Sequence, residues 1–195
     1  MKIMVFMIVI LASIAKTYSQ KNWQLAKDKE GIKVFVNKVS NSDYCAFKAI
    51  MTVRASKIEI VKILKDVNTY PKWFAFTASA KLITQSTNEQ DFLMETDYPW
   101  PYSNECMKYT MNFVKNEFDN QEITIIGTNK NTVCNYTLKR ANGYILLESD
   151  NENTKITYYF HCEPSQSIPS WLINPRIHEM PFQTFKALRN LLHQK

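Results

Sequence analysis

The sequence contains very little glycine and histidine, and both shortages restrict what the protein can do. Only three glycines occur in 195 residues, and none belongs to a glycine-rich loop of the kind that cradles phosphate groups. Three histidines and four cysteines are present, and no two cysteines have the Cys-x-x-Cys spacing that zinc sites favour. We therefore expect no metal and no other bound cofactor.

Runs of a single charge are missing as well. The chain has 24 basic and 18 acidic residues, a formal net charge of +6, without any cluster of lysine and arginine. This predicts modest attraction to anionic surfaces, such as transient contact with a membrane, and argues against nucleic-acid binding. The length suits one domain with a sizeable core. No repeat or linker divides the chain, and we expect a monomer.

The longest apolar run lies at the start of the chain. Lys2 precedes the apolar stretch 3–12, and Thr17 and Ser19 are small residues in positions that suit a cleavage site. The pattern is typical of a secretory signal peptide, because the run is short for a membrane span. We predict a signal peptide over residues 1–19, cleaved after Ser19, and a secreted or periplasmic protein. An uncleaved membrane anchor is the alternative.

Residues 20–195 are expected to form one domain in which strands dominate. After a polar lead-in over 23–31, apolar residues alternate with polar ones in several segments, which is the period of half-buried strands. Ser56 is suited to cap a helix over 57–65, and another short helix is expected over 68–74. The predicted strands are 32–36, 44–54, 80–85, 92–98, 107–113, 123–125, 144–149 and 156–162.

The last thirty residues predict a long amphipathic helix. Apolar residues recur at steps of three and four from Ile173 to Leu191. Pro169 suits the helix start, and Pro181 is expected to bend the helix near Ile177, whose carbonyl loses its amide partner. The predicted fold class is α+β: a curved antiparallel sheet of about seven to nine strands wrapped around this helix.

A curved sheet and one helix seldom fill the space between them, which predicts an internal pocket. The inner strand positions carry aromatic residues and methionines, which suit an apolar ligand, although ordinary core packing explains any one of them. The candidate ligand-binding residues on strands are Phe47, Met51, Phe92, Met94, Tyr109, Met111, Phe113, Tyr158 and Phe160. The remaining candidates are Trp73, Trp100, Trp171, Arg176, Ile177 and Met180.

Four motifs occur in an order and spacing found in one known family. They are Trp23 with Asp28–Val34, then Asp66, Tyr70 and Trp73, then Tyr98–Pro101, and finally Ile168–Asn174 with Pro181–Phe185. Together they resemble START (StAR-related lipid-transfer) domains of the helix-grip superfamily, over about Trp23 to Leu192. The resemblance implies a tunnel that holds one lipid, with the C-terminal helix as a lid and Arg176 near the mouth. At the mouth, Arg176 would form an ion pair with an acidic head group of the ligand. The alternative is that Arg176 is an exposed surface residue without such a role.

One departure from the family pattern concerns the residues after Tyr98–Pro101. START domains usually carry Ser-x-Arg-Asp there, whereas this chain has Glu105 and Cys106 in place of the Arg-Asp pair. The resemblance also implies that the strand before the first helices lies beside the last strand, which sets Cys45 opposite Cys162. A hairpin brings Cys106 near Cys134. Two disulfides are therefore expected, with four buried thiols as the alternative.

The function expected from these observations is non-enzymatic binding and transport of a lipid or other hydrophobic molecule. One alternative is an enzyme of the same superfamily, similar to cyclases or hydrolases, and another is an interaction module whose cavity is filled by side chains. His161 and Cys162 cannot act together, because adjacent strand residues point to opposite faces. Asp97, Arg176 and His178 remain acid–base candidates for the enzyme alternative.

Overall fold

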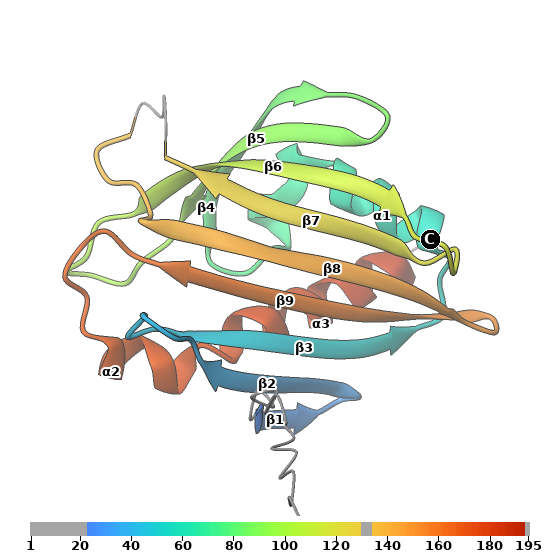
Figure 1. The fold of residues 1–195 in the computed structure, drawn as a ribbon, viewed down its shortest axis with the longest axis horizontal. Coiled ribbons are helices and arrows are strands. Elements are labelled where there is room, and N and C mark those ends of the chain that lie inside the picture. Colours follow the sequence, from blue (N-terminus) through green and yellow to red (C-terminus); the bar gives the residue numbers. More distant parts are fainter. Residues whose placement is uncertain (1–22, 130–133, 194–195) are drawn as a thin grey trace, which may run out of the picture.

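The computed structural model describes residues 23–129 and 134–193, so the predicted signal peptide lies outside the described residues. These residues form one antiparallel sheet of nine strands, with α1 (Lys57–Lys65) and α3 (Glu179–His193) on the same face (Figure 1). The α+β fold class is confirmed, with a C-terminal helix, α3, packed on the sheet. Within the described part of the chain, no helix has both the length and the apolar character to cross a membrane.

The strand order is β1-β2-β3-β9-β8-β7-β6-β5-β4, and every neighbouring pair is antiparallel. The strands are β1 (Gln24–Lys29), β2 (Ile32–Lys38), β3 (Cys45–Val53), β4 (Thr77–Gln85), β5 (Glu89–Thr96), β6 (Glu105–Lys115), β7 (Gln121–Thr128), β8 (Arg140–Asp150) and β9 (Asn153–Glu163). Only the β3–β9 pair joins distant parts of the chain without a hairpin. Its register sets Val53 opposite Thr154 and Phe47 opposite Phe160.

The polar lead-in proves to be a strand, β1, which corrects the prediction. Most of its residues are exposed, so it shows no alternation of buried and exposed positions. It pairs with β2 through a tight turn at Glu30 and Gly31, whose φ angles are +54° and +71°. Glycine adopts such a left-handed backbone without steric cost. An edge strand of this kind is specified by its turn more than by its hydrophobic pattern.

The helix after β3 begins where the sequence predicts. Ser56 accepts a hydrogen bond from the backbone amide of Glu59, and the Glu59 side chain accepts one from the Ser56 amide, a reciprocal capping box. Ile60, Ile63 and Leu64 are buried against the sheet. A short 3₁₀ helix, η1 (Val67–Lys72), follows, in agreement with the second predicted helix.

The C-terminal region is interrupted, rather than one bent helix. It consists of α2 (Ser170–Ile173), the 3₁₀ turn η2 (Asn174–Arg176) and α3. Pro181 lies in the first turn of α3, where its missing amide would have no partner in any case, so it starts a helix instead of bending one. The buried side of α3, which includes Phe182, Phe185 and Leu188, packs in the core.

Candidate functional site

A cavity of about 430 Å³ lies between the sheet and the C-terminal region. Its wall is made by inner positions of β3, β5, β6 and β9, by α2, η2 and the start of α3, and by the loops around Phe76 and Pro99. Most of the lining side chains are aromatic, methionine or aliphatic. The volume and the apolar character are those of pockets that hold one small hydrophobic molecule.

Most of the predicted ligand-binding residues line this cavity. On the strands these are Phe47, Phe92, Met94, Tyr109, Met111, Tyr158 and Phe160. From the C-terminal region they are Arg176, Ile177 and Met180. Alternation therefore identified the inner face of the strands correctly, while contact of these residues with a ligand stays a prediction.

Met51, Trp73 and Phe113 do not line the cavity, although all three are buried. The Nζ atom of Lys65, at the end of α1, lies 4.8 Å from the centre of the Phe113 ring, so helix α1 covers this end of β6. The indole nitrogen of Trp73 donates to Oγ1 of Thr69 within the η1 segment. Phe113 and Trp73 therefore belong to the part of the core beside α1 and η1, and Met51 is a core residue outside the cavity wall.

Trp100 and Trp171 also lie outside the cavity wall, because both side chains point to solvent. Trp100 is 92% exposed and Trp171 is 74% exposed. Their neighbours Pro99 and Leu172 do line the cavity, so the two indoles stand beside its opening. They are surface residues beside the mouth, and their contact with a ligand stays a prediction.

Sequence reasoning missed the part of the wall that comes from loops. Residues 74–76, Tyr102 and Ile168 line the cavity but lie outside regular strands, where no period marks an inner face. Tyr44 and Tyr70 line it as well. The aromatic residues in these segments are the only feature of the sequence that could have identified this part of the wall. Aromatic residues occur equally in a closed core, so they do not distinguish the two.

Residues 129–195 match the model of the START domain family. A STAR-related lipid transfer protein of Xanthomonas axonopodis, known from its crystal structure, is 33% identical, with a TM-score of 0.83, and the match covers 88% of this chain and 99% of that one. The chain belongs to the START domain family. An uncharacterised protein of Pseudomonas aeruginosa is 28% identical over 182 residues, which is 90% of this chain and 89% of that protein. Human StAR-related lipid transfer protein 5, 11% identical, shares the fold with a TM-score of 0.77 over 91% of this chain and 89% of its own.

In this START domain, Glu105 has a structural role at the cavity end of the sheet. The side chain is fully buried, and its carboxylate accepts hydrogen bonds of 2.9–3.0 Å from the backbone amides of Ser165 and Gln166. The Ser165 hydroxyl and the Gln166 side-chain amide donate to it as well. Gln166 also exchanges two hydrogen bonds with the backbone of Ser103. Glu105 thus fixes the loop between β9 and α2, part of which lines the cavity.

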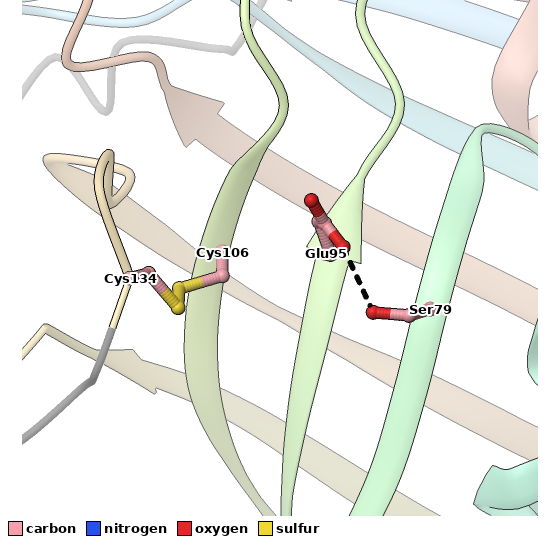
Figure 2. The surroundings of a disulfide bond; sticks show 4 residues. All are labelled: Ser79, Glu95, Cys106 and Cys134. Atoms are coloured by element: carbon pink, nitrogen blue, oxygen red, sulfur yellow. Dashed lines mark hydrogen bonds between the residues drawn. A yellow bond between two sulfur atoms is a disulfide. The ribbon is translucent and has the colours of Figure 1, made fainter.

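A disulfide joins Cys106 on β6 to Cys134, with 6.3 Å between the Cα atoms, as expected for this pair (Figure 2). The backbone of Cys106 also binds the returning segment, since its amide donates to the Tyr136 carbonyl and its carbonyl accepts from the Leu138 amide. Leu138 lines the cavity. The disulfide therefore anchors a segment that completes one wall of the START-domain cavity.

The second predicted bridge does not form: Cys45 and Cys162, both in the described part of the chain, are free thiols. The two strands are neighbours as expected, but the β3–β9 ladder stops at Phe47 and Phe160. The amide of Cys45 instead donates to Oδ1 of Asn174 at 2.9 Å, which ties this end of β3 to η2. Cys162 lines the cavity, where burial raises the pKa of its thiol to about 12.

The acid–base candidates are not assembled into one group. Asp97 and Arg176 line the START-domain cavity but are exposed at its opening. His178 lies outside the wall, with its Nε2 atom 3.0 Å from Oε1 of Glu179. Within the described residues, no three histidine, cysteine, aspartate or glutamate side chains form a group able to hold a metal ion.

Proposed function

We propose that this START domain binds and carries a hydrophobic molecule, such as a lipid, without changing it chemically. The observation that carries the proposal is the internal cavity of about 430 Å³, whose wall is mostly aromatic, methionine and aliphatic. Moving apolar surface from water into such a wall contributes about 25 cal/mol for each Å² buried. The similarity to the Xanthomonas axonopodis lipid transfer protein supports a lipid as the cargo.

We propose further that the ligand enters beside Trp100 and Trp171, which face solvent at the cavity mouth. Exposed tryptophans favour the interface between a membrane and water, because the ring is amphipathic. Transient contact of these two side chains with a membrane would place the opening at the lipid surface. The loop at Pro99 and the α2–η2 segment would act as the lid.

Substituting a lining residue with tryptophan tests the cavity directly. M180W puts a larger side chain into the space, so we expect uptake of a fluorescent long-chain alcohol to weaken by about tenfold or more. The matched control is I83W, because Ile83 is exposed on β4 and is not part of the wall. Both variants should keep the circular dichroism of the unaltered protein. Equal uptake by M180W and the unaltered protein would contradict the proposal.

The enzyme alternative is tested by following the ligand itself. Native mass spectrometry of the purified protein, followed by solvent extraction, identifies whatever molecule is bound. We expect its mass to be unchanged after prolonged incubation with the protein. Conversion to a product, lost in the variant D97N, would favour an enzyme instead. A compact protein that binds no member of a panel of lipid classes would favour an interaction module.

We also propose that the protein is exported, with a signal peptide removed after Ser19. The Cys106–Cys134 disulfide supports this, because stable disulfides are found mostly in oxidising compartments. Amino-terminal sequencing of the protein recovered from its natural host should begin at Gln20. A protein that retains Met1 or the apolar run 3–12 would be an anchored form and would contradict export as a free domain.

A further inference from the structure

Three tyrosines present open hydroxyls to the cavity, and we call Tyr98, Tyr109 and Tyr158 the hydroxyl cluster. All three line the wall, and their hydroxyls have no hydrogen-bond partner within residues 23–129 and 134–193. Within the same residues, Oε1 of Glu163 is the only buried side-chain nitrogen or oxygen without a hydrogen bond. The three hydroxyls therefore keep accessible surface. Because Tyr109 and Tyr158 are each only 2% exposed, the accessible surface of their hydroxyls faces the cavity, and the half-buried Tyr98 lines the same cavity.

Two other tyrosines of the same wall have paired hydroxyls. Tyr70 donates to the carbonyl oxygen of Leu64, and Tyr44 donates to that of Ile168, each at 2.6 Å. A hydroxyl that leaves water without a new partner is unfavourable. The hydroxyls of Tyr44 and Tyr70 have protein acceptors, whereas those of the hydroxyl cluster have none among the described residues. The three hydroxyls of the cluster are therefore available to a ligand.

The members of the hydroxyl cluster lie near one another although they come from different elements. The rings of Tyr109 on β6 and Tyr158 on β9 lie 6.3 Å and 6.0 Å from the ring of Phe160. Burial raises the pKa of Tyr98, which follows β5, and the nearby Cys162, the Glu105 carboxylate and Tyr109 raise it further. One polar group of a bound molecule can therefore meet more than one of these side chains.

The interior of the cavity is polar at this cluster but carries no charge. Burial holds the pKa of each cluster tyrosine far above its usual value, so the hydroxyls stay protonated and can donate. Among the lining residues, the charged groups Asp97 and Arg176 are exposed at the opening. An ionised ligand group placed deep in the cavity would lose its hydration without gaining an opposite charge.

We propose that the hydroxyl cluster recognises the polar group of the ligand, and that the ligand is an apolar molecule with a neutral oxygen, a hydroxyl or a carbonyl, at its buried end. The inference rests on the proposed function, because it needs a ligand in the cavity. A neutral oxygen accepts hydrogen bonds from the tyrosine hydroxyls, while the aromatic and methionine wall holds the rest of the molecule. A site built in this way discriminates against an analogue that lacks the oxygen.

The affinities of the mature protein for 1-dodecanol and dodecane test this, because the two molecules differ by one hydroxyl. They are measured by displacement of a bound fluorescent probe. In Y109F and Y158F we expect binding of 1-dodecanol to weaken about three- to tenfold, while binding of dodecane stays the same. Y70F is the matched control: it also removes one cavity tyrosine hydroxyl, but a paired one, so the ratio of the two affinities should not change.

The melting temperatures of the unliganded proteins show whether a substitution weakens binding only because it destabilises the fold. Y109F and Y158F should melt at the same temperature as the unaltered protein or higher, whereas Y70F should melt lower because it loses a hydrogen bond. Equal weakening for 1-dodecanol and dodecane, or unchanged 1-dodecanol binding in both variants, would overturn the proposal. Failure of the unaltered protein to bind either compound would overturn the proposed function, and the role of the cluster with it.

Discussion

Glu105 shows how one buried carboxylate organises the loops around the cavity. Its two backbone donors, the amides of Ser165 and Gln166, belong to the loop that leads from β9 to α2. In the variant E105A they have no acceptor, and each buried unsatisfied group costs about 1–3 kcal/mol. We predict that E105A lowers the free energy of unfolding by about 3 kcal/mol, measured by urea denaturation.

Glu95 on β5 is the control for that substitution. Its carboxylate accepts a hydrogen bond of 2.9 Å from the Ser79 hydroxyl on β4 at a solvent-exposed position (Figure 2). Water replaces this partner when the glutamate is removed, so E95A should lower the free energy of unfolding by less than about 0.5 kcal/mol. Similar losses in the two variants would show that Glu105 does not hold the loop.

His161 is expected to make the stability depend on pH. Its side chain is 2% exposed, with Nε2 lying 3.2 Å from Oγ of Ser42 and 3.8 Å from Oε1 of Glu163. Burial lowers the pKa of His161 below its usual 6.5, and this outweighs the opposite effect of Glu163. The unfolded chain then binds the proton more readily than the folded one, so stability is lost as the pH falls below about 6.5.

The variant H161Q should remove that contribution. We predict that its urea midpoints at about pH 7 and about pH 5 lie closer together than those of the unaltered protein. The measurement is a pair of urea titrations for each protein. An unchanged difference between the two pH values would mean that another group titrates.

At the scale of elements, the strands were predictable where one face is buried and the other is not. On β6, for example, Tyr109 and Met111 alternate with half-buried polar residues, and the predicted strand lies within the observed one. Strand β1 escaped prediction because it lacks this contrast. The C-terminal break was misplaced because Pro181 fits both a kinked helix and a helix start, and only packing decides between them.

The cavity itself was less predictable than its strands. Alternation along β6 assigns both Met111 and Phe113 to the inner face, but it does not say that Met111 lines the cavity whereas α1 covers Phe113. Likewise, the family resemblance sets Cys45 opposite Cys162, whereas the β3–β9 ladder stops at Phe47 and Phe160 and the Cys45 amide donates to Asn174 instead. The first outcome depends on how far helix α1 extends over the sheet. The second depends on a contact between segments more than one hundred residues apart.

Helix α3 is attached to the first hairpin by a small polar contact. The Nζ atom of Lys27 on β1 lies 2.8 Å from Oε1 of Glu179 and 4.1 Å from the centre of the Phe182 ring. The hydrogen bond from Lys27 lowers the pKa of Glu179 below its usual 4.5. Its stabilising effect is therefore present at neutral pH and is lost as the pH falls through that lowered pKa.

We predict that E179Q lowers the free energy of unfolding at neutral pH by about 0.5 kcal/mol, because solvent screens a partly exposed pair. The difference from the unaltered protein should disappear in strongly acidic buffer. E152Q is the control, since the Arg54–Glu152 pair is 80% exposed on both sides and should contribute nothing measurable. A difference that persists in acid would point to altered packing of α3, measurable in the same urea titrations.

For the whole molecule, the disulfide between Cys106 and Cys134 is expected to contribute much of the stability. It closes a segment of 28 residues, and a loop of that size corresponds to about 3.6 kcal/mol. The double variant C106A/C134A should lose about that amount in urea unfolding. C45A, which removes a thiol outside the bridge, is the control.

Mass spectrometry of alkylated protein checks the same pairing independently. The two free thiols, Cys45 and Cys162, should be labelled in unreduced, denatured protein. All four cysteines should be labelled after reduction. Four labels without reduction would contradict the bridge.

The order of the strands also determines when the domain can finish folding. Strand β3 pairs with β9, so the centre of the sheet joins segments about 100 residues apart, and Val53 meets Thr154 only after almost all of the chain is available. Such non-local pairing is slow to form. During synthesis, β3 and β8 therefore remain open edges until β9 is available, and a chain truncated before β9 would be left as two sheet fragments prone to aggregate.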